Sequence, residues 1–549
     1  MTSASPSATP RNASPVEEFN TATDLLIYVG TFNVESRLPY QPFDEWLLGN
    51  VLRRAQANTG AQKTQQVENS ALPGTHRLEL PHIYCLTFQE FGPPNTALLD
   101  ANNGLIRSCT TMVNNALHRL AHIATLGQAT PTEPNVILIP DEVVYQFQTT
   151  ELKYPLPQDD LADLDYPLHY TLHASYHYAG MLTFIYTLDP VITPRVHNLQ
   201  FNRAGCGPLF SGLKGALGIS LELSWASQCY SFCFVGAHLT AHEHLAAIRN
   251  RNYHSLCHRL CYFPQSSDDS LTTHSARDIP AEIHRDTVWD QLPTRTLFDH
   301  DYVFFFGDLN YRTQCNVQQN LKVPINPATL SQLIKHDELK QVMKSGVAFE
   351  EFREDTIRFG PTYKFMVGCN IYVYRKRNPS WCDRILYWSK HFSGPDLSTS
   401  STERRNSSSL SEKSGSSTST LATKPVGLSQ EQAQIITPLF YGAHFQYTCS
   451  DHRPVSGLYR VHLVPQSLTN PTQSVSAGMV LDPWWRVKLT IGWYIDRIIG
   501  HCWCLRLYLP LSLFQVTLIL CSVLVLAILI FAVSPNEPLT KESFTRIFA

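Results

Sequence analysis

Acids, amides and histidines in this 549-residue chain gather directly after strand-like runs. The most informative cluster is Gly307 to Arg312, which follows the aromatic and β-branched run Tyr302 to Phe306. An aspartate such as Asp308 can bind or activate water, and an arginine suits phosphate. A glycine, an acid and an amide after a strand also form ordinary turns, so this cluster alone leaves both interpretations open.

Further clusters of the same kind lie beside other strand-like runs. Catalytic groups are commonly held on rigid elements, so the recurrence of such clusters predicts one shared site rather than separate loops. The additional clusters contain Asn33, Gln89 with Glu90, His238, Asp383, and Asp451 with His452.

The residue types in these clusters indicate phosphoryl chemistry assisted by a metal ion. Glu90 and Asn33 offer hard oxygen donors, which suit Mg²⁺. Asp308 can orient or deprotonate a water molecule. His452 can donate a hydrogen bond to an oxyanion, and a carboxylate such as Asp383 could hold its tautomer.

His238 and Asn310 offer further donors to a phosphoryl group, and such a set stabilises a loose transition state by positioning and charge. Two other chemistries compete with this interpretation. A zinc site could use His238, His242 and His244, but no glutamate follows His238 and no thiolate pair accompanies these histidines. A covalent cysteine phosphatase needs a phosphate-binding loop between its cysteine and arginine, and Cys382 to Arg384 is too short for one.

The elements that must position these groups recur through one large region, residues 23–465. Helix-like stretches, Leu98 to Leu126 and His242 to Tyr262, lie between some of the strands, and this mixture predicts an α/β fold of layered sheets with helices outside. Residues 265–294 and the Ser/Thr-rich residues 393–434 are predicted to be polar insertions. The predicted strands are Leu25 to Val29, Ile83 to Phe88, Val136 to Ile139, Met181 to Tyr186, Ile219 to Leu223, Cys229 to Val235, Tyr302 to Phe306 and Ile385 to Trp388.

Composition restricts the compartment and the partners. The net charge of −3 shows no basic bias, so nucleic acid is not an expected partner. The 14 cysteines follow no regular framework, which indicates a reducing compartment. Residues 1–22, rich in Ser, Pro, Ala and Thr, are predicted to be a disordered tail.

The C-terminal region indicates a membrane anchor. The run from Leu507 to Val533 carries no charged residue, and about 20 apolar residues suffice to cross a bilayer as a helix. Only residues 534–549 follow, so we expect a tail anchor. Residues 466–506 are predicted to be a linker and a juxtamembrane segment rich in tryptophan and basic residues, which suits the membrane interface and places the large N-terminal part in the cytosol.

These motifs, in this order, resemble the inositol polyphosphate 5-phosphatases. That family belongs to the endonuclease/exonuclease/phosphatase superfamily, which has a deoxyribonuclease I-like fold. The resemblance covers residues 23–464 and implies a four-layer α/β sandwich with two central sheets. It also implies Mg²⁺-dependent removal of the 5-phosphate from phosphoinositides or soluble inositol phosphates. The matching motifs are Thr31 to Val34, Gln89 with Glu90, His238 to His242, Gly307 to Arg312, Pro361 to Phe365, Pro379 to Leu386 and Ser450 to Val455.

The resemblance also implies a role for each matching residue. Glu90 and Asn33 would hold the metal, and Asp308 would activate the attacking water. The groups implied to contact or support the scissile phosphate are His238, Asn310, His452, Asp383 and Asp451. The implied readers of the neighbouring ring phosphates are Tyr311, Arg312, Lys364, Arg375, Lys376, Arg377 and Arg384.

The chain departs from the family pattern in its loops. Phe32 stands where tryptophan is usual, and Glu35 and Ser36 replace an Asn-Gly or Gly. Leu213 replaces the asparagine of the family's Gly-Asn-Lys-Gly-Ala stretch. A C-terminal tail anchor occurs in only some members of the family. In this feature the chain resembles a fungal form of the enzyme that lies in the endoplasmic reticulum.

The leading hypothesis is therefore a tail-anchored lipid phosphatase acting on phosphatidylinositol 4,5-bisphosphate, because an anchor concentrates the enzyme at the bilayer. Its expected partners are a phosphoinositide or inositol phosphate substrate and the membrane. A neutral sphingomyelinase of the same superfamily is the second enzyme hypothesis. A catalytically dead tether that binds phosphoinositides is the third.

Overall fold

The computed structural model describes residues 24–38, 41–61, 75–130, 133–140, 167–262, 295–314, 325–373, 377–392, 435–465 and 480–506. The predicted N-terminal tail, the two polar insertions, the 507–533 run and the 534–549 tail lie outside these ranges. Among the helices that the structure describes, none is long and apolar enough to cross a membrane.

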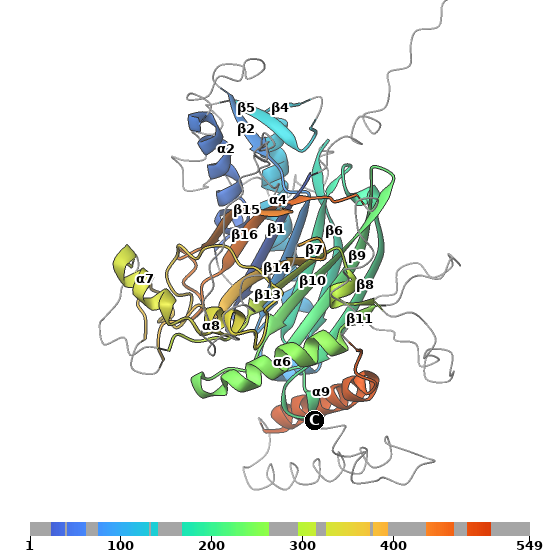
Figure 1. Cartoon of the computed structure of the whole chain (residues 1–549), viewed down its shortest axis with the longest axis vertical. Coiled ribbons are helices and arrows are strands. Elements are labelled where there is room, and N and C mark those ends of the chain that lie inside the picture. Colours follow the sequence, from blue (N-terminus) through green and yellow to red (C-terminus); the bar gives the residue numbers. More distant parts are fainter. Residues whose placement is uncertain are drawn as a thin grey trace, which may run out of the picture.

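A six-stranded mixed sheet forms one half of the fold (Figure 1). Its order is β15-β16-β1-β3-β7-β6, with β1 and β3 parallel and the other neighbours antiparallel. The strands are β1 (Asp24–Asn33), β3 (Ile83–Gln89), β6 (His169–Tyr178), β7 (Met181–Asp189), β15 (Ile436–Ala443) and β16 (Val455–His462).

A five-stranded sheet, ordered β14-β13-β10-β9-β8, packs face to face against the first. Only β10 and β13 are parallel in it. The strands are β8 (Val196–Gly205), β9 (Gly215–Trp225), β10 (Gln228–His238), β13 (Tyr302–Asp308) and β14 (Asp383–Ser389).

The continuous apolar run of β13 reflects burial on both of its faces. Phe304 and Phe306 lie in the core between the sheets, whereas Val303 and Phe305 pack in a second core with α6 (Ala246–Arg259) and α8 (Glu338–Lys344). A strand covered on both faces needs apolar side chains at every position rather than at alternate ones.

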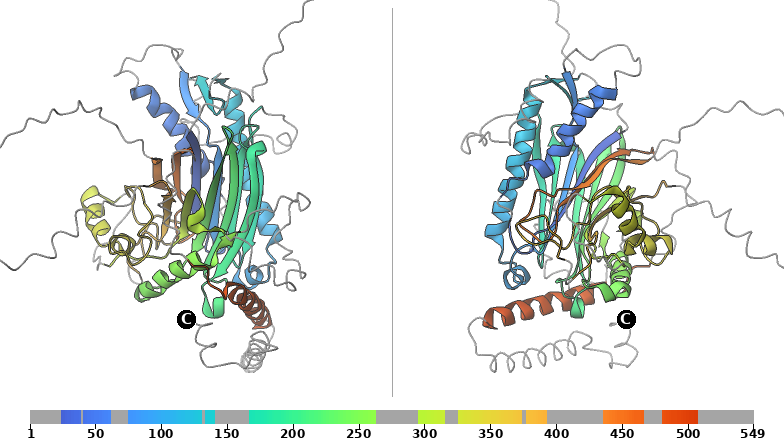
Figure 2. Two further views of the ribbon diagram at one scale, coloured as in Figure 1. Left: turned by 45° about the vertical axis from the view of Figure 1, so that its right-hand side comes forward. Right: turned by 90° about the vertical axis from the view of Figure 1, so that its left-hand side faces the viewer.

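Helices cover the outer side of the six-stranded sheet as well (Figure 2). The long helix α4 (Asn103–Thr125) buries Cys109, Val113, Ala116, Leu117 and Leu120, a spacing that places one stripe on the core. α1 (Asp44–Leu47) packs against α4, α2 (Gly49–Ala61) packs on β2, and α3 (Pro94–Leu98) directly precedes α4 in the chain. The predicted mixed α/β fold is confirmed.

The eight predicted strands all fall within observed strands, and the two helix-like stretches contain α4 and α6. The sequence patterns missed β6, β8 and β15, and in two small sheets they missed every strand except β5. Those sheets are built from β2 (Thr75–Glu79), β4 (Gln128–Ala129) and β5 (Val136–Pro140), and from β11 (Cys261–Tyr262) and β12 (Arg295–Thr296). A further helix, α7 (Pro327–Lys335), projects from the flank.

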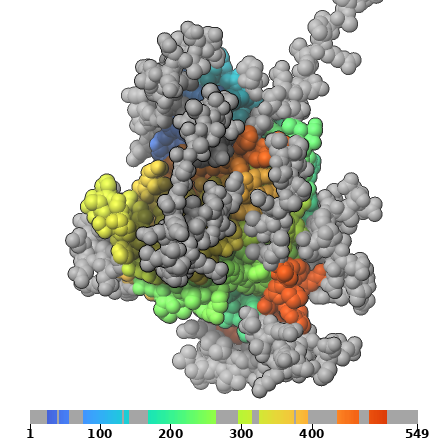
Figure 3. Space-filling view, viewed as in Figure 1, coloured from blue at the N-terminus to red at the C-terminus, as the bar shows by residue number. Residues whose placement is uncertain are grey.

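The segment predicted to be a linker and juxtamembrane stretch contains a helix, α9 (Trp485–Arg506). Its buried residues Ile491 and Ile495 pack with Phe210 of the 3-10 turn η3 (Pro208–Phe210). Figure 3 shows part of the 480–506 segment in orange-red at the lower edge of the molecule. This part of the chain therefore packs against the sandwich.

We expect Gly236→Ala to destabilise the sandwich, because the two sheets approach closely at this glycine. An added Cβ would lie 2.4 Å from Thr87 Oγ1 and 3.0 Å from Thr183 Oγ1, on strands of the facing sheet. Overpacking of this kind costs about 1–3 kcal/mol of unfolding free energy, measured by urea titration. Gly104→Ala is the matched control: nothing lies within 4 Å of its added Cβ, so this change in α4 should stabilise by up to about 1 kcal/mol. Equal stability of the two variants would contradict the expected clash.

Candidate active site

Strand register brings the predicted clusters to one end of the two sheets. In the five-stranded sheet Asp308 lies opposite His238 on one side and opposite Asp383 on the other. In the six-stranded sheet Asn33 lies opposite Gln89, and Glu90 follows directly. The carboxyl ends of the parallel pairs β1–β3 and β10–β13 therefore both carry polar residues toward the same region.

The Asp308 carboxylate lies at the centre of this region and is almost fully buried. Asn33 reaches across from the other sheet and donates its Nδ2 to Asp308 Oδ2 at 3.0 Å. His238 Nε2 lies 3.4 Å and His452 Nε2 lies 3.9 Å from the same oxygen. The other carboxylate oxygen accepts the backbone N–H of Asn310 at 3.1 Å.

The backbone around Asp308 takes conformations that aim its neighbours. Gly307 has a φ of 138°, and an added Cβ would lie 2.0 Å from Ala237 O. Asn310 has a φ of 57°, a left-handed conformation that asparagine tolerates better than most residues. Its Nδ2 donates to Leu239 O at 3.1 Å, and its Oδ1 accepts from the Arg312 guanidinium.

A second group of residues holds His452. Its Nδ1 pairs with Asp383 Oδ2 at 2.9 Å, and the same oxygen accepts the Thr362 hydroxyl at 2.6 Å. The ring packs against Tyr363, with ring centroids 4.5 Å apart. With Nδ1 engaged by a carboxylate, Nε2 is the ring nitrogen directed at the Asp308 side of the site.

The buried charges shift one another's pKa values. Burial raises the pKa of Asp308, but the neighbouring His452, His238 and Lys214 outweigh burial and hold that pKa well below its usual range. Burial lowers the pKa of His452, but the carboxylates of Asp383 and Asp308 reverse this effect and raise it to about 9. At neutral pH the site therefore contains an ionised Asp308 and a protonated His452.

Lys214 is a site residue that the sequence reasoning missed. Its Nζ contacts His238 Nε2, and burial followed by this cation lowers the pKa of His238. Burial lowers the pKa of Lys214 itself. The signal was available in the Gly212 to Ala216 stretch, which keeps its lysine although Leu213 replaces an asparagine.

The structure separates the predicted phosphate readers into two groups. Lys364 is partly exposed, and its Nζ pairs with Asp451 at the margin of the site. Arg377 donates to His242 Nδ1 at 3.0 Å from an exposed position. Arg375 and Lys376 lie outside the described residues.

The predicted role in binding ring phosphates is wrong for three residues, because the structure buries them among protein groups. Tyr311 lies in the outer core, and its hydroxyl donates to Asn250 Oδ1 at 2.7 Å. Arg312 stacks on Tyr363 and donates its Nε to the Asn310 carbonyl at 3.0 Å, so it positions Asn310. The fully buried Arg384 is neutralised by two carboxylates.

The donor set suits a hard divalent cation. Ligand atoms of Asp308, Asp383 and His452 lie within 4.8 Å of one another. Asp383 Oδ2 and His452 Nδ1 are already engaged with each other, however, so a cation there would have to break their pairing. The predicted ligands fit better. The Glu90 carboxylate is about half open to solvent, with Oε1 3.7 Å from His238 Nε2, and the Asn33 amide oxygen keeps a second lone pair beyond its bond from Glu35 N.

The two facing sheets and their shared cluster of acids, amides and histidines define a protein of the endonuclease/exonuclease/phosphatase type. A family model described as Endonuclease/Exonuclease/phosphatase family 2 matches residues 30–458, and the chain belongs to this family.

Curated relatives share parts of this chain. Rat synaptojanin-2 is 31% identical over 225 residues, which cover 40% of this chain and 13% of that protein. Type I inositol polyphosphate 5-phosphatase 8 of Arabidopsis thaliana is 26% identical over 377 residues, 66% of this chain and 65% of that protein. Rat phosphatidylinositol 4,5-bisphosphate 5-phosphatase A is 29% identical over 259 residues, 47% of this chain and 20% of that protein. The matched region thus spans less than two thirds of each relative.

Arg384→Met should destabilise the protein strongly, because it leaves two carboxylates buried without their cation. Arg384 Nη1 donates to both carboxylate oxygens of Asp337 at 3.0 Å, and its Nε donates to Glu354 Oε1 at 2.6 Å. Breaking a buried pair costs about 3–5 kcal/mol of unfolding free energy. Arg377→Met, at a surface position, should stay within about 0.5 kcal/mol of the parent. Urea unfolding measures both variants. An Arg384→Met protein as stable as the parent would contradict the structural role of this arginine.

The His452–Asp383 pair should give a pH-dependent stability. The pKa of His452 is about 9 in the folded protein and about 6.5 in the unfolded chain. The pair therefore stabilises the folded state fully below a pH of about 6.5, and this stabilisation is lost as the pH rises through about 9. Asp308 also raises the pKa of His452, so Asp383→Asn should remove only part of this effect. We expect the unfolding free energy to fall by about 1–3 kcal/mol at pH 6 and by much less at a pH of about 9.5. Urea titrations with chelator at both pH values test this, and an equal loss at both would contradict the pairing.

Proposed function

We propose that this protein hydrolyses the 5-phosphate of phosphoinositides in a Mg²⁺-dependent reaction at a membrane surface. The preferred substrate is phosphatidylinositol 4,5-bisphosphate, which yields phosphatidylinositol 4-phosphate. The observation that carries the proposal is the convergence of Asn33, His238, Asp308, Asn310 and His452 from both sheets on one point. The names of the inositol polyphosphate 5-phosphatase relatives support the same substrate class.

Each of these residues has a defined task in the proposed reaction. The ionised Asp308 accepts a hydrogen bond from the attacking water and orients it, since a loose phosphoryl transition state needs little deprotonation of the nucleophile. His452, protonated at neutral pH and oriented by Asp383, donates from Nε2 to a phosphoryl oxygen. Asn310 uses one amide N–H on Leu239 and has a second for the phosphoryl group.

Charge balance completes the proposed site. Lys214, held against His238, adds a cation where negative charge develops. Mg²⁺ held by Glu90 and Asn33 would supply further positive charge to the scissile phosphate. We assign Lys364, Arg377 and the adjacent Arg375 and Lys376 to the neighbouring ring phosphates, because a polyanionic head group needs several cations.

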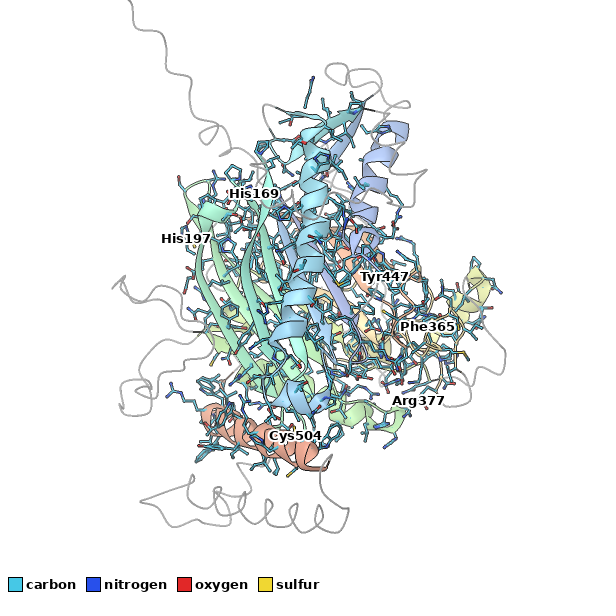
Figure 4. All side chains as sticks on the ribbon, turned by 180° about the vertical axis from the view of Figure 1, so that it is seen from behind. His169, His197, Phe365, Arg377, Tyr447 and Cys504 are labelled. Atoms are coloured by element: carbon cyan, nitrogen blue, oxygen red, sulfur yellow. The ribbon has the colours of Figure 1, made fainter. Side chains whose placement is uncertain are left out.

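Exposed apolar side chains next to the site support a lipid substrate. Met366, Val367 and Ile371 are 52%, 39% and 44% exposed in the loop that follows Lys364. Exposed apolar groups beside a charged site are typical of a surface that meets a membrane. Figure 4 places Phe365, which begins this loop, on the same flank as Arg377.

The proposed location is a membrane, with a single tail anchor and the catalytic domain in the cytosol. The endoplasmic reticulum is the expected membrane. Support comes from the uncharged run Leu507 to Val533, which directly follows α9. On α9 itself Trp493, Tyr494 and Trp503 are exposed, and such residues favour the bilayer interface.

Asp308→Asn should abolish phosphate release while the fold persists, because the amide lacks the charge that orients the water. We expect a fall in kcat of at least about 1,000-fold, the scale seen when essential catalytic groups are removed. The assay measures phosphate released from phosphatidylinositol 4,5-bisphosphate vesicles, with and without Mg²⁺. Circular dichroism confirms folding, and Thr130→Ala at a peripheral turn is the control. Activity retained by Asp308→Asn would contradict its role.

The same assay separates the other two hypotheses. Parallel vesicles that contain sphingomyelin would identify a sphingomyelinase, whose single phosphate needs neither Lys364 nor Arg377. Vesicle binding by the parent protein without release of phosphate from any lipid, or from soluble inositol phosphates, would identify a tether. Release only from lipids with a 5-phosphate, and only with Mg²⁺, is the result that the proposal expects.

A further inference from the structure

Helix α9 packs against a loop that leads into the candidate active site. The 3-10 turn η3 lies between β8 and β9, and Phe210 at its end packs with Ile491 and Ile495 of α9. A few residues later Gly215 begins β9 directly opposite His238. In Figures 1 and 2, α9 accordingly lies at the same end of the sheets as α6, which follows the carboxyl end of β10.

The polar contact between α9 and this loop is made by Asp496. Its Oδ1 accepts the Ser211 hydroxyl at 2.6 Å and the Gly212 N–H at 2.9 Å, and its Oδ2 lies 3.0 Å from the same N–H. Asp496 is only 4% exposed. Burying a carboxylate is costly, and apolar packing alone would suffice to dock a helix. The buried Asp496 is therefore better explained by its hydrogen bonds to the loop than by attachment of the helix. Two oxygens on adjacent donors set both the position and the orientation of the turn.

The loop adopts a backbone that needs external support. Leu209 and Phe210 have φ values of 51° and 63°, a left-handed conformation that costs about 1 kcal/mol or more at each non-glycine residue. α9 approaches so closely that a Cβ added at Gly492 would lie 2.2 Å from Phe210 O. The helix therefore lies directly against the strained part of the loop.

Hydrogen bonds extend from this contact to Leu213, the residue directly before Lys214. The Ser211 hydroxyl that donates to Asp496 also accepts Leu213 N at 3.3 Å. The Lys214 carbonyl accepts Cys206 N at 2.6 Å and Gly207 N at 3.2 Å, which closes the loop at its base. From that backbone the Lys214 side chain reaches His238.

We propose that Asp496 is a positioning residue, through which α9 holds the Ser211–Gly212 turn and thereby places Lys214 against His238. This inference rests on the proposed phosphatase activity, and it makes α9 a part of the active-site architecture. A helix next to the proposed membrane anchor would then contribute directly to turnover, even for a substrate that is not in a membrane.

The test measures turnover of inositol 1,4,5-trisphosphate by the full chain in detergent micelles, so that membrane docking does not affect the rate. Lys214→Met should lower kcat about 100-fold, the effect of removing one donor to a developing charge. Asp496→Ala should lower kcat about tenfold and change KM by less than about threefold, because substrate still binds but Lys214 is misplaced. Asp496→Asn keeps an acceptor oxygen for both donors and should stay within about threefold of the parent.

A double-mutant cycle distinguishes positioning from simple structural support. If Asp496 acts through Lys214, Asp496→Ala should cause no further loss in the Lys214→Met background. Asp100→Asn is the matched control, because it removes the ion pair between Asp100 and Arg497 of α9 without touching the loop. This control should leave kcat unchanged. Ser211→Ala, which removes one donor and leaves the helix packing intact, replaces Asp496→Ala in the cycle if that variant does not fold.

Failure of the proposed phosphatase activity and failure of the positioning role of Asp496 give different results. A parent protein that releases no phosphate would overturn the proposed function itself. An active parent whose Asp496 and Lys214 variants have multiplicative effects on kcat, or whose Asp496→Ala variant loses only thermal stability, would overturn the positioning role and leave the proposed function standing.

Discussion

The hydrogen bond from Asn33 to Asp308 joins the two sheets at the site on which the remaining groups converge. Asp308 belongs to the five-stranded sheet and Asn33 to the six-stranded one, so this contact exists only when the sheets pack at one distance and one register. A buried carboxylate is expensive unless donors and cations surround it. The groups that compensate for this cost are the same groups that make the region chemically useful.

Each group that faces Asp308 is held in turn by another residue behind it. Asp383 and Thr362 hold His452, and Arg312 with Leu239 holds Asn310. Side chains restrained in this way do not have to reorganise when charge develops in a transition state, which is the main source of electrostatic catalysis. Arg312 and Arg384, which the sequence-based interpretation assigned to substrate, instead bond to protein groups behind the site.

Helix α9 extends this arrangement beyond the matched family region, which ends at residue 458. Because its buried face meets η3 and its exposed face carries aromatic residues, one element connects the active-site end of the sandwich with the surface that we propose to face a membrane. The physical consequence is a fixed relation between that surface and the site end of the sheets.

The buried strands, the mixed α/β class and the central polar residues could be predicted from the sequence, because a strand packed on both faces must be apolar throughout and its polar end then stands out. Asn33, His238, Asp308, Asn310, Asp383 and His452 were all identifiable in this way. The tertiary structure alone decided which cations face the site. Tyr311, Arg312 and Arg384 lie in motifs next to residues of the candidate site, yet packing turns them into the protein, whereas Lys214 reaches His238 from a loop with no polar cluster of its own. The same holds for Asp496, whose partners at Ser211 and Gly212 are 285 and 284 residues away in the chain. Local patterns report burial and secondary structure, but the direction of a side chain and its partners depend on contacts between distant segments.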